Sequence, residues 1–220
     1  PRPASHVWGD QAWMAARATR QAPQAPISIY ELHPGSWVRG PNGDMLDWRN
    51  LADRLVPYVK AMGFTHVELM PVAAWMDERH LPSLGLANAW GYNPVNFFAL
   101  DPRLALGGAA DLATLCATYA QAGIGIILDI VLNHTAESDT FGATISLRGL
   151  DNAVYYRHAT DDPGRLINDT GCGHTLALDR APVVRMAMDA LRHWAIAYRV
   201  DGFRFDLGVA LGRGADGFDA

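Results

Sequence analysis

The sequence predicts an α/β fold that forms part of a (β/α) barrel, and three observations support this. Short apolar segments alternate four times with helix-like segments, which is the pattern of parallel strands joined by right-handed crossovers. Half of the 220 residues are hydrophobic, enough for a sizeable core. The third observation is that polar residues stand where the predicted strands end, as barrel enzymes place them: His33, Asn133, His134 and Asp206.

A doubly wound sheet would show the same alternation of strands and helices. No Gly-rich phosphate-binding turn follows the first predicted strand, however, so the barrel is favoured. We expect residues 27–220 to form the barrel domain, with about four β/α units and an irregular insertion at 135–180 after the third strand. Residues 1–26 show no sustained period and are expected to be a linker or the end of a preceding domain.

The first unit begins with the strand Ile27–His33. Asp47 is placed to cap the following helix and Gly63 to end it, while Pro57 should kink its interior. Apolar residues recur along this helix at helical spacing: Leu51, Leu55, Val59 and Met62.

The second strand is predicted at His66–Val72, and a loop of more than thirty residues follows it. The next helix ends at Gly123 and carries an apolar side formed by Leu112, Leu115, Cys116 and Tyr119. The third strand, Ile124–Val131, is the most apolar and suits burial on both faces. A further helix starting at Pro182 leads to the fourth strand, Val200–Leu207, and its predicted apolar stripe comprises Val184, Met188, Leu191, Ala195 and Tyr198.

The composition argues against two classes of partner. Only 19% of the residues are charged and the formal net charge is −5, so a phosphate-binding basic face is not expected and no nucleic acid is predicted. No apolar run is long enough to span a membrane, and no secretory signal opens the sequence, which favours a cytoplasmic protein. Cys116 and Cys172 match no metal-ligand spacing and are expected to be free thiols; we expect no metal and no cofactor.

The fourth strand carries the residues of greatest chemical interest. Alternation places Arg204 and Asp206 on one face of the strand, towards the barrel interior, and Phe203 and Phe205 on the other, against helices. A neighbouring guanidinium keeps a carboxylate ionised, as a nucleophile requires. The same spacing also fits an ion pair that only links strands, and spacing alone leaves both interpretations open.

Two other segments could contribute to a site. Asp129 stands in an apolar strand and must find a partner when buried, for which Arg204 is a candidate. His134 follows that strand, where it could bind a ligand or serve only the structure. The aromatic loop segment Trp90–Pro94 could stack on sugar faces or fill a small core of its own.

These residues together resemble the α-amylase superfamily of retaining glycosidases and transglycosidases, which use a (β/α)8 TIM barrel. Asp129–His134 (DIVLNH) is similar to the first signature of that family, and Gly202–Asp206 (GFRFD) to the second. Gly91 and Tyr92 match the pair whose tyrosine stacks under the sugar next to the scissile bond. The resemblance covers roughly Ile27 to Arg213.

Within the superfamily, the predicted insertion at 135–180 indicates which group of enzymes the chain resembles most. Ser146–Tyr156 and Asn168–Leu176 are similar to bacterial isoamylase-type glycogen debranching enzymes, which implies hydrolysis of α-1,6 branch linkages in glycogen or limit dextrin. Tyr30–Trp37 is more similar to branching transferases or trehalose-releasing hydrolases, so these activities stay as alternatives. A non-catalytic glucan-binding fragment is another.

The resemblance implies a role for each site residue. Asp206 would be the catalytic nucleophile, and Arg204 would hold it ionised and oriented. Tyr92 and His134 would bind the sugar, and Asp129 would brace Arg204 at the floor of the site. The implied partner is an α-glucan: glycogen, limit dextrin or a maltooligosaccharide.

The general acid of this family is a glutamate that follows the fifth strand, and no fifth strand is predicted within the 220 residues. We therefore expect the chain to be the N-terminal half of a catalytic barrel. On this expectation it would be inactive alone, and its unpaired strand edges would favour self-association.

Overall fold

A four-stranded parallel sheet with helices around it organises the computed structural model, which describes residues 6–214 and 217–218. The strands are β1 (Ile29–Leu32), β2 (His66–Leu69), β3 (Gly125–Ile130) and β4 (Gly202–Phe205), followed by the short β5 (Arg213–Gly214) and β6 (Gly217–Phe218). The helices are α1 (Gln11–Arg20), α2 (Trp48–Met62), η1 (Pro82–Leu84), α3 (Ala109–Ala122), α4 (Leu147–Tyr155), α5 (Ala181–Ala197) and α6 (Gly208–Leu211). Residues 1–5 of the predicted linker, and residues 215–216 and 219–220 of the predicted barrel segment, lie outside the described residues.

The order of the strands distinguishes between the two folds that the sequence allows. The four strands follow one another in the sheet as β1-β2-β3-β4, and β2 pairs in parallel with both of its neighbours. A doubly wound sheet reverses its strand order at a switch point, whereas a barrel keeps the order of the sequence. The prediction of about four β/α units of a barrel is therefore confirmed.

The contact between β2 and β3 requires a glycine. Gly125 lies opposite His66 in the register, and a Cβ atom on Gly125 would come within 2.3 Å of His66 Cδ2. Any larger residue would displace the buried imidazole or shift the register of the two strands.

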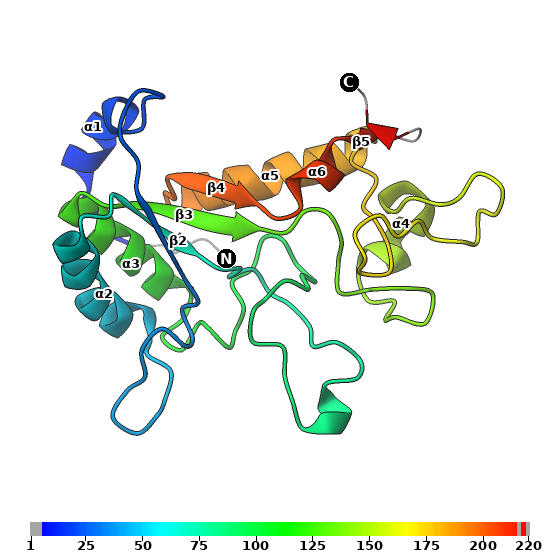
Figure 1. The fold of residues 1–220 in the computed structure, drawn as a ribbon, viewed down its shortest axis with the longest axis horizontal. Helices are drawn as coiled ribbons and strands as arrows, with labels where there is room; N and C mark the ends of the chain where they lie inside the picture. The colour runs from blue at the N-terminus through cyan, green and yellow to red at the C-terminus, as the bar shows by residue number, and fades with distance from the viewer. Residues whose placement is uncertain (1–5, 215–216, 219–220) are drawn as a thin grey trace. The chain divides into compact units, whose positions relative to one another are not determined.

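The chain divides into two compact units. The first comprises residues 1–72, 99–129 and 193–204, and the second comprises residues 73–98, 130–192 and 205–220. In the first unit α2 and α3 lie side by side in contact (Figure 1), and both helices bury apolar side chains: Leu51 and Leu55 on α2, Leu112 and Tyr119 on α3.

Helix α2 confirms most of its sequence prediction. The Asp47 carboxylate accepts a hydrogen bond from the backbone N–H of Asn50, and Gly63 ends the helix with a left-handed φ of 79°. The helix continues through Pro57. The prediction that Met62 belongs to the buried stripe is wrong, because its side chain is 59% exposed. Met62 is the last residue of α2.

The predicted apolar stripe of the final helix is also wrong in part. Val184 and Met188 are exposed, and α5 instead buries a stripe of small residues with one large anchor: Val183, Ala187, Ala190, Trp194 and Ala197. This stripe has the same helical period shifted by one residue. Alanine weighs little in a hydrophobicity pattern, yet it allows the close approach that buries Trp194, so the pattern favoured the wrong face.

Phe205 differs from its prediction as well. It was expected to pack against helices, and its side chain is 41% exposed. It is the last residue of β4, which lies at one side of the described sheet.

Helix α1 occupies a segment in which the sequence shows no sustained period, and side-chain contacts hold it in the first unit. Trp13 Nε1 donates to Asp201 Oδ1 at 2.9 Å, and Arg17 forms an ion pair with the same carboxylate at 3.1 Å. Asp201 Oδ2 accepts the backbone N–H of Ile126 at 2.8 Å. One buried carboxylate therefore joins α1, the start of β3 and the segment that precedes β4.

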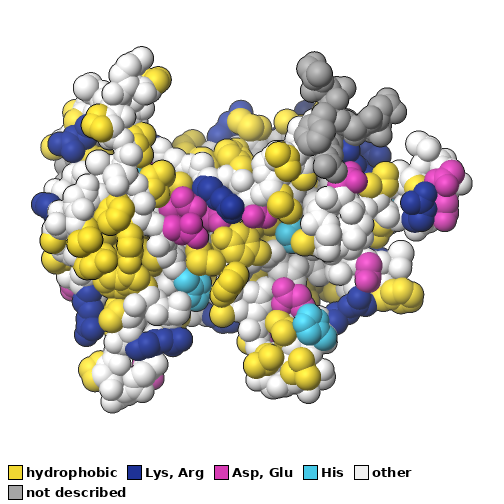
Figure 2. Space-filling model, in the orientation of Figure 1, with side chains coloured by type: hydrophobic (Ala, Val, Ile, Leu, Met, Phe, Trp, Pro, Cys, Tyr) yellow, Lys and Arg dark blue, Asp and Glu magenta, His cyan; other side chains and the backbone are white. Residues whose placement is uncertain are grey.

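The second unit consists mainly of the long loops that follow β2 and β3, together with α4. Isolated bridges join Trp75 to Pro94 and Tyr156 to Leu176. In the part of the chain that the structure describes, no helix is long and apolar enough to cross a membrane. On the face drawn in Figure 2, basic side chains are scattered among acidic and neutral ones rather than gathered in a stripe.

Removing the Asp201 carboxylate should destabilise the first unit. We expect Asp201→Ala in the full-length protein to lower the free energy of unfolding by about 1–3 kcal/mol, because the buried N–H of Ile126 loses its acceptor. Urea denaturation measures this change. Asp53→Ala, at an exposed position of α2, is the matched control and should change the free energy by no more than about 0.5 kcal/mol. Equal stability of the two variants would contradict the prediction.

Candidate active site

Asp129 and Arg204 form an ion pair within the first unit. Arg204 Nη1 donates to Asp129 Oδ1 at 3.0 Å and to Oδ2 at 2.9 Å. Asp129 is buried in β3, and Arg204 on β4 keeps 44% of its side chain exposed. The predicted partner of Asp129 is thus confirmed, and a buried carboxylate needs such a partner because an unpaired buried charge is costly.

Further carboxylates surround this pair. Glu31 and Glu68 lie opposite one another in the β1–β2 register. Burial raises the pKa of Glu68, the charges of Glu31 and Asp129 raise it further, and Arg204 lowers it. The Arg204 guanidinium therefore provides positive charge at a place where several carboxylates come together.

In the second unit, Asp206 is tied to Asn133. The side-chain amide Nδ2 of Asn133 donates to the backbone oxygen of Asp206 at 2.9 Å and to its carboxylate Oδ2 at 3.2 Å. The backbone N–H of Asp206 donates to the carbonyl of Ile130 at 3.0 Å. Leu207, which follows, has a φ of 45°, a left-handed conformation that is uncommon for a non-glycine residue and turns the chain sharply into α6.

His134 continues this network. Its Nδ1 pairs with Asn133 Oδ1, and its Nε2 lies 2.8 Å from the carbonyl oxygen of Tyr92. The two oxygens together favour an imidazolium, because a neutral imidazole carries only one N–H. Burial lowers the pKa of His134, and the Tyr92 carbonyl and the charges of Asp206 and Glu78 offset only part of this effect.

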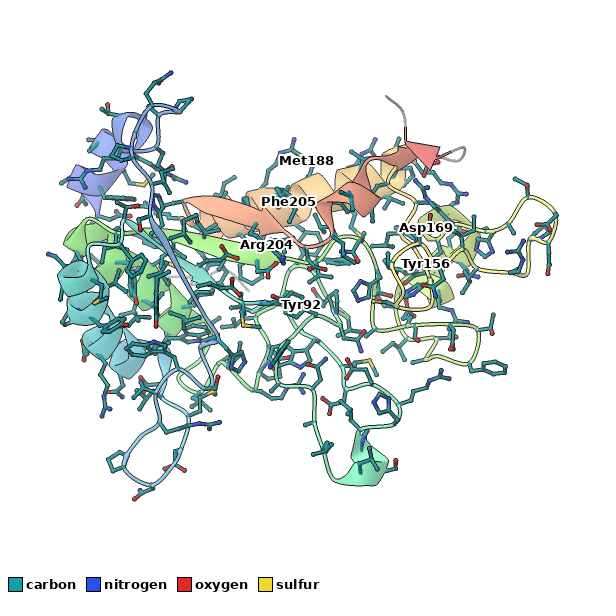
Figure 3. All side chains as sticks on the ribbon, in the orientation of Figure 1. Tyr92, Tyr156, Asp169, Met188, Arg204 and Phe205 are labelled. Atoms are coloured by element: carbon teal, nitrogen blue, oxygen red, sulfur yellow. The ribbon has the colours of Figure 1, made fainter. Side chains whose placement is uncertain are left out.

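The imidazole and the carboxylate are therefore joined through a single amide side chain. Tyr92 lies in the loop that follows β2 (Figure 3), and its backbone places it at the other end of the network.

A buried polar network stands behind these residues. Thr135 Oγ1 lies 2.8 Å from both Tyr156 Oη and His174 Nε2, and the Tyr156 hydroxyl donates to Glu137 at 2.8 Å. The backbone N–H of Leu176 donates to the carbonyl of Asn133 at 3.0 Å. The insertion thus folds back onto the residues that follow β3 and supports them.

The structure brings the sequence-predicted residues together in two groups. Asp129 and Arg204 meet in the first unit, and Tyr92, His134 and Asp206 share one network in the second. The expected contact between Arg204 and Asp206 stays a prediction.

From the sequence Asn133 is only a polar residue at a strand end, and the structure makes it the link between Asp206 and His134. Its place between an apolar strand and His134 was the available signal. Among the residues that the structure describes, no three His, Cys, Asp or Glu side chains come together as a metal ion would need.

Comparisons with known proteins show the family of this chain. The family model described as "Alpha amylase, catalytic domain" matches residues 31–170. The chain therefore belongs to the alpha-amylase catalytic-domain family, and the resemblance predicted from the short motifs is confirmed.

Several similar curated proteins are named glycogen debranching enzymes. The glycogen debranching enzyme of Yersinia enterocolitica is 44% identical over 164 residues, which is 72% of this chain and 24% of that protein. The glycogen debranching enzyme of Erwinia tasmaniensis is 38% identical over 213 residues, covering 94% of this chain and 31% of that protein. The chain thus spans about a quarter to a third of the curated relatives that it matches.

A solved structure shows the same fold. The type I pullulanase of Bacillus subtilis, crystallised with maltose, superimposes with a TM-score of 0.68 at 29% sequence identity. The match covers 96% of this chain and 30% of the pullulanase.

Acid should destabilise the protein through His174. Burial lowers the pKa of His174 to about 4, below the ordinary value of 6.5. Between pH 6.5 and 4 the unfolded chain binds a proton that the folded protein does not, so stability present above pH 6.5 is lost as the pH falls, by up to about 3 kcal/mol.

We expect His174→Gln to remove most of this dependence in urea denaturation of the full-length protein at pH 7 and pH 4.5. The exposed His80 provides the control variant His80→Gln, which should keep the dependence of the wild type. An unchanged pH dependence in His174→Gln would show that His174 does not titrate in this way.

Proposed function

We propose that this chain belongs to a glycogen debranching glycosidase, which hydrolyses α-1,6 branch linkages of glycogen or limit dextrin with retention of configuration. One observation carries the proposal: Asp206 is held by Asn133, whose amide also holds His134 and through it the carbonyl of Tyr92. This arrangement gives one oriented carboxylate beside polar groups suited to a sugar. The family and the names of the relatives indicate the substrate class.

The proposed reaction starts at the Asp206 carboxylate. One of its oxygens attacks the anomeric carbon and forms a glycosyl ester, while the bond to the leaving oxygen breaks and that oxygen takes a proton from a general acid. Water then attacks the same carbon, gives its proton back to that acid residue and releases Asp206. The hydrogen bond from Asn133 to Oδ2 would restrict the carboxylate to a fixed orientation for this attack.

The other predicted site residues would support the same centre. Tyr92 would bind the reacting sugar by stacking. His134 would bind it by exchanging the hydrogen bond of its Nε2 from the Tyr92 carbonyl to a sugar hydroxyl. Asp129 would brace Arg204 through the ion pair between them. A retaining mechanism also needs a second carboxyl group, which acts as the general acid.

The relatives favour debranching over the alternatives of a branching transferase, a trehalose-releasing hydrolase or a non-catalytic fragment. The α-glucan partner is part of this proposal. A cytoplasmic location, the division into residues 1–26 and 27–220, and self-association through strand edges stay predictions from the sequence.

Asp206→Asn tests the nucleophile. We expect the full-length variant to lose at least about 1,000-fold in kcat on branched dextrin, because an amide cannot form the glycosyl ester. Asp189→Asn removes an exposed carboxylate of α5 that forms an ion pair with Arg192, and it should leave kcat unchanged. Retention of a tenth or more of wild-type kcat by Asp206→Asn would exclude Asp206 as the nucleophile.

A product assay tests the reaction class. Full-length protein incubated with glycogen should raise the number of reducing ends and release short linear chains. A branching transferase would leave the number of reducing ends unchanged, and a trehalose-releasing hydrolase would liberate a non-reducing disaccharide. Either of those outcomes would replace the debranching proposal.

A further inference from the structure

Near the start of the insertion, the loop at 137–143 surrounds the side chain of a single arginine. Arg148 stands in the first turn of α4, shortly after this loop (Figure 1). Its guanidinium points back to the loop and donates to backbone carbonyl oxygens there: Glu137 and Gly142 at 3.1 Å, Asp139 at 2.7 Å, Ala143 at 3.3 Å and Thr140 at 3.5 Å. We call the loop at 137–143 the carbonyl ring.

The number of oxygens around the guanidinium resembles the coordination of a cation more than a set of ordinary hydrogen bonds. Arg148 Nη1 carries only two hydrogens, yet four of the carbonyls lie around this one nitrogen. Backbone carbonyls are also ligands with which proteins hold bare cations. Arg148 Nε is shielded from solvent and has no hydrogen-bond partner within the described part of the chain, so the hydrogen bonds of the guanidinium are those to the ring.

The backbone of the carbonyl ring is folded tightly. A Cβ atom on Gly142 would come within 1.9 Å of the carbonyl oxygen of Glu137, so this close approach requires a glycine. Ser138 has a φ of 51°, a left-handed conformation that is uncommon for a non-glycine residue. Backbone of this kind persists only where its surroundings hold it, and the Arg148 guanidinium supplies the attraction that draws the carbonyls together.

A buried carboxylate holds the chain that follows the ring. Glu137 is fully buried, and its oxygens accept the backbone N–H groups of Ile145 and Ser146 at 2.9 Å and of Arg148 at 3.0 Å. Burial alone would raise the pKa of Glu137, but these N–H groups and the Tyr156 hydroxyl lower it by more, so the carboxylate stays charged. Glu137 and Arg148 are therefore joined twice, through a carboxylate and through a carbonyl.

Glu137 connects the ring to the residue that follows His134. The backbone N–H of Glu137 donates to Thr135 Oγ1 at 3.2 Å. The Tyr156 hydroxyl donates to the Glu137 carboxylate and lies 2.8 Å from the same Thr135 oxygen. The position of Thr135, and with it the backbone beside His134, thus depends on Glu137.

The ring is also joined to the loop after β2, which carries Tyr92. The side chain of Asp139 forms an ion pair with Arg79 of that loop at 2.8 Å. Just before the ring, the backbone N–H of Ala136 donates to the carbonyl of Pro94 at 2.7 Å. The carbonyl ring therefore contacts both segments that carry the residues proposed to bind the sugar.

We propose that the carbonyl ring is a cation-binding site that the chain fills with its own Arg148 guanidinium, and that Arg148 in this way positions Tyr92 and His134. The inference rests on the proposed function, because it takes the sugar-binding roles of these two residues from it. Arg148 is a positioning residue, since it acts through the ring and Glu137. Once the Arg148 side chain is removed, the ring should accept a small organic cation, and free guanidinium matches the lost group in shape and charge.

Removing the side chain and returning the cation tests the site. We expect Arg148→Ala in the full-length protein to raise KM for a branched maltooligosaccharide at least about tenfold. Its kcat should stay within about threefold of wild type, because the hydrogen bonds between Asn133 and Asp206 do not involve the ring. Guanidinium chloride at about 50 mM, far below the concentrations that unfold proteins, should bring KM back to within about threefold of wild type.

Urea is the matched additive, because it is planar like guanidinium but carries no charge. At the same concentration and ionic strength it should restore nothing. If guanidinium restores KM no better than urea, or if Arg148→Ala leaves KM unchanged, the inference is overturned.

Two further variants separate the ring from the rest of the insertion. Arg165→Ala removes an exposed arginine that pairs with the exposed Asp161, and it should leave KM unchanged with or without guanidinium. Gly142→Ala distorts the ring while keeping Arg148, so it should raise KM, and guanidinium should not lower it again because the site is already filled. An unchanged KM in Gly142→Ala would contradict the role of the ring.

Hydrogen exchange tests the ring without any activity. The backbone N–H groups of Ile145 and Ser146 should exchange at least about tenfold faster in Arg148→Ala, and guanidinium should slow them again. Should Arg148→Ala not fold in plain buffer, its refolding yield decides instead: guanidinium should raise it well above the yield in urea, and equal yields would count against the site.

The two proposals fail separately. Full-length protein that releases no chains from glycogen contradicts the proposed function, and the exchange measurement on the ring still stands. Protein that releases chains, but shows the same exchange and the same KM in Arg148→Ala as in wild type, contradicts the cation site alone.

Discussion

Buried carboxylates, each with its own set of partners, are the constraint on which this structure depends. A charge removed from water must be paired or hydrogen-bonded. Otherwise the free-energy cost of burying it would exceed the free energy of unfolding of the whole domain. Asp201 binds α1 and the start of β3, Asp129 binds Arg204, and Glu137 gathers the start of the insertion. Asp201 and Asp129 join segments that lie far apart in the sequence, and Glu137 fixes a loop within its own insertion.

The same constraint explains how a site forms at the ends of apolar strands. Strand β3 is buried almost throughout, and the chain becomes polar directly after it, at Asn133 and His134. Strand β4 ends in the same way at Asp206, and the left-handed turn at Leu207 stops the strand there. Because polar groups at these positions cannot join the core, they bond to one another, and the result is an oriented carboxylate beside an imidazole.

The insertion after β3 contains a buried polar network of its own. Its polar residues are not loosely solvated: Thr135, Tyr156, His174 and Glu137 share one buried network. A fully satisfied network of this kind specifies one conformation of the loop. The insertion therefore supports the residues that follow β3.

Local patterns alone determined the four strands, both ends of α2, the C-terminal end of α3, the partner of Asp129 and the family, because strand alternation, caps and short motifs are encoded within a few residues. Tertiary structure alone decided what depends on distant contacts. It chose the barrel order of the strands, buried the alanine face of α5 in place of the Val184 face, docked α1 through Asp201 and made Asn133 the link to Asp206. Hydrophobic period does not report how closely a neighbour approaches or which polar groups remain to be paired, and these two quantities exist only once the chain has folded.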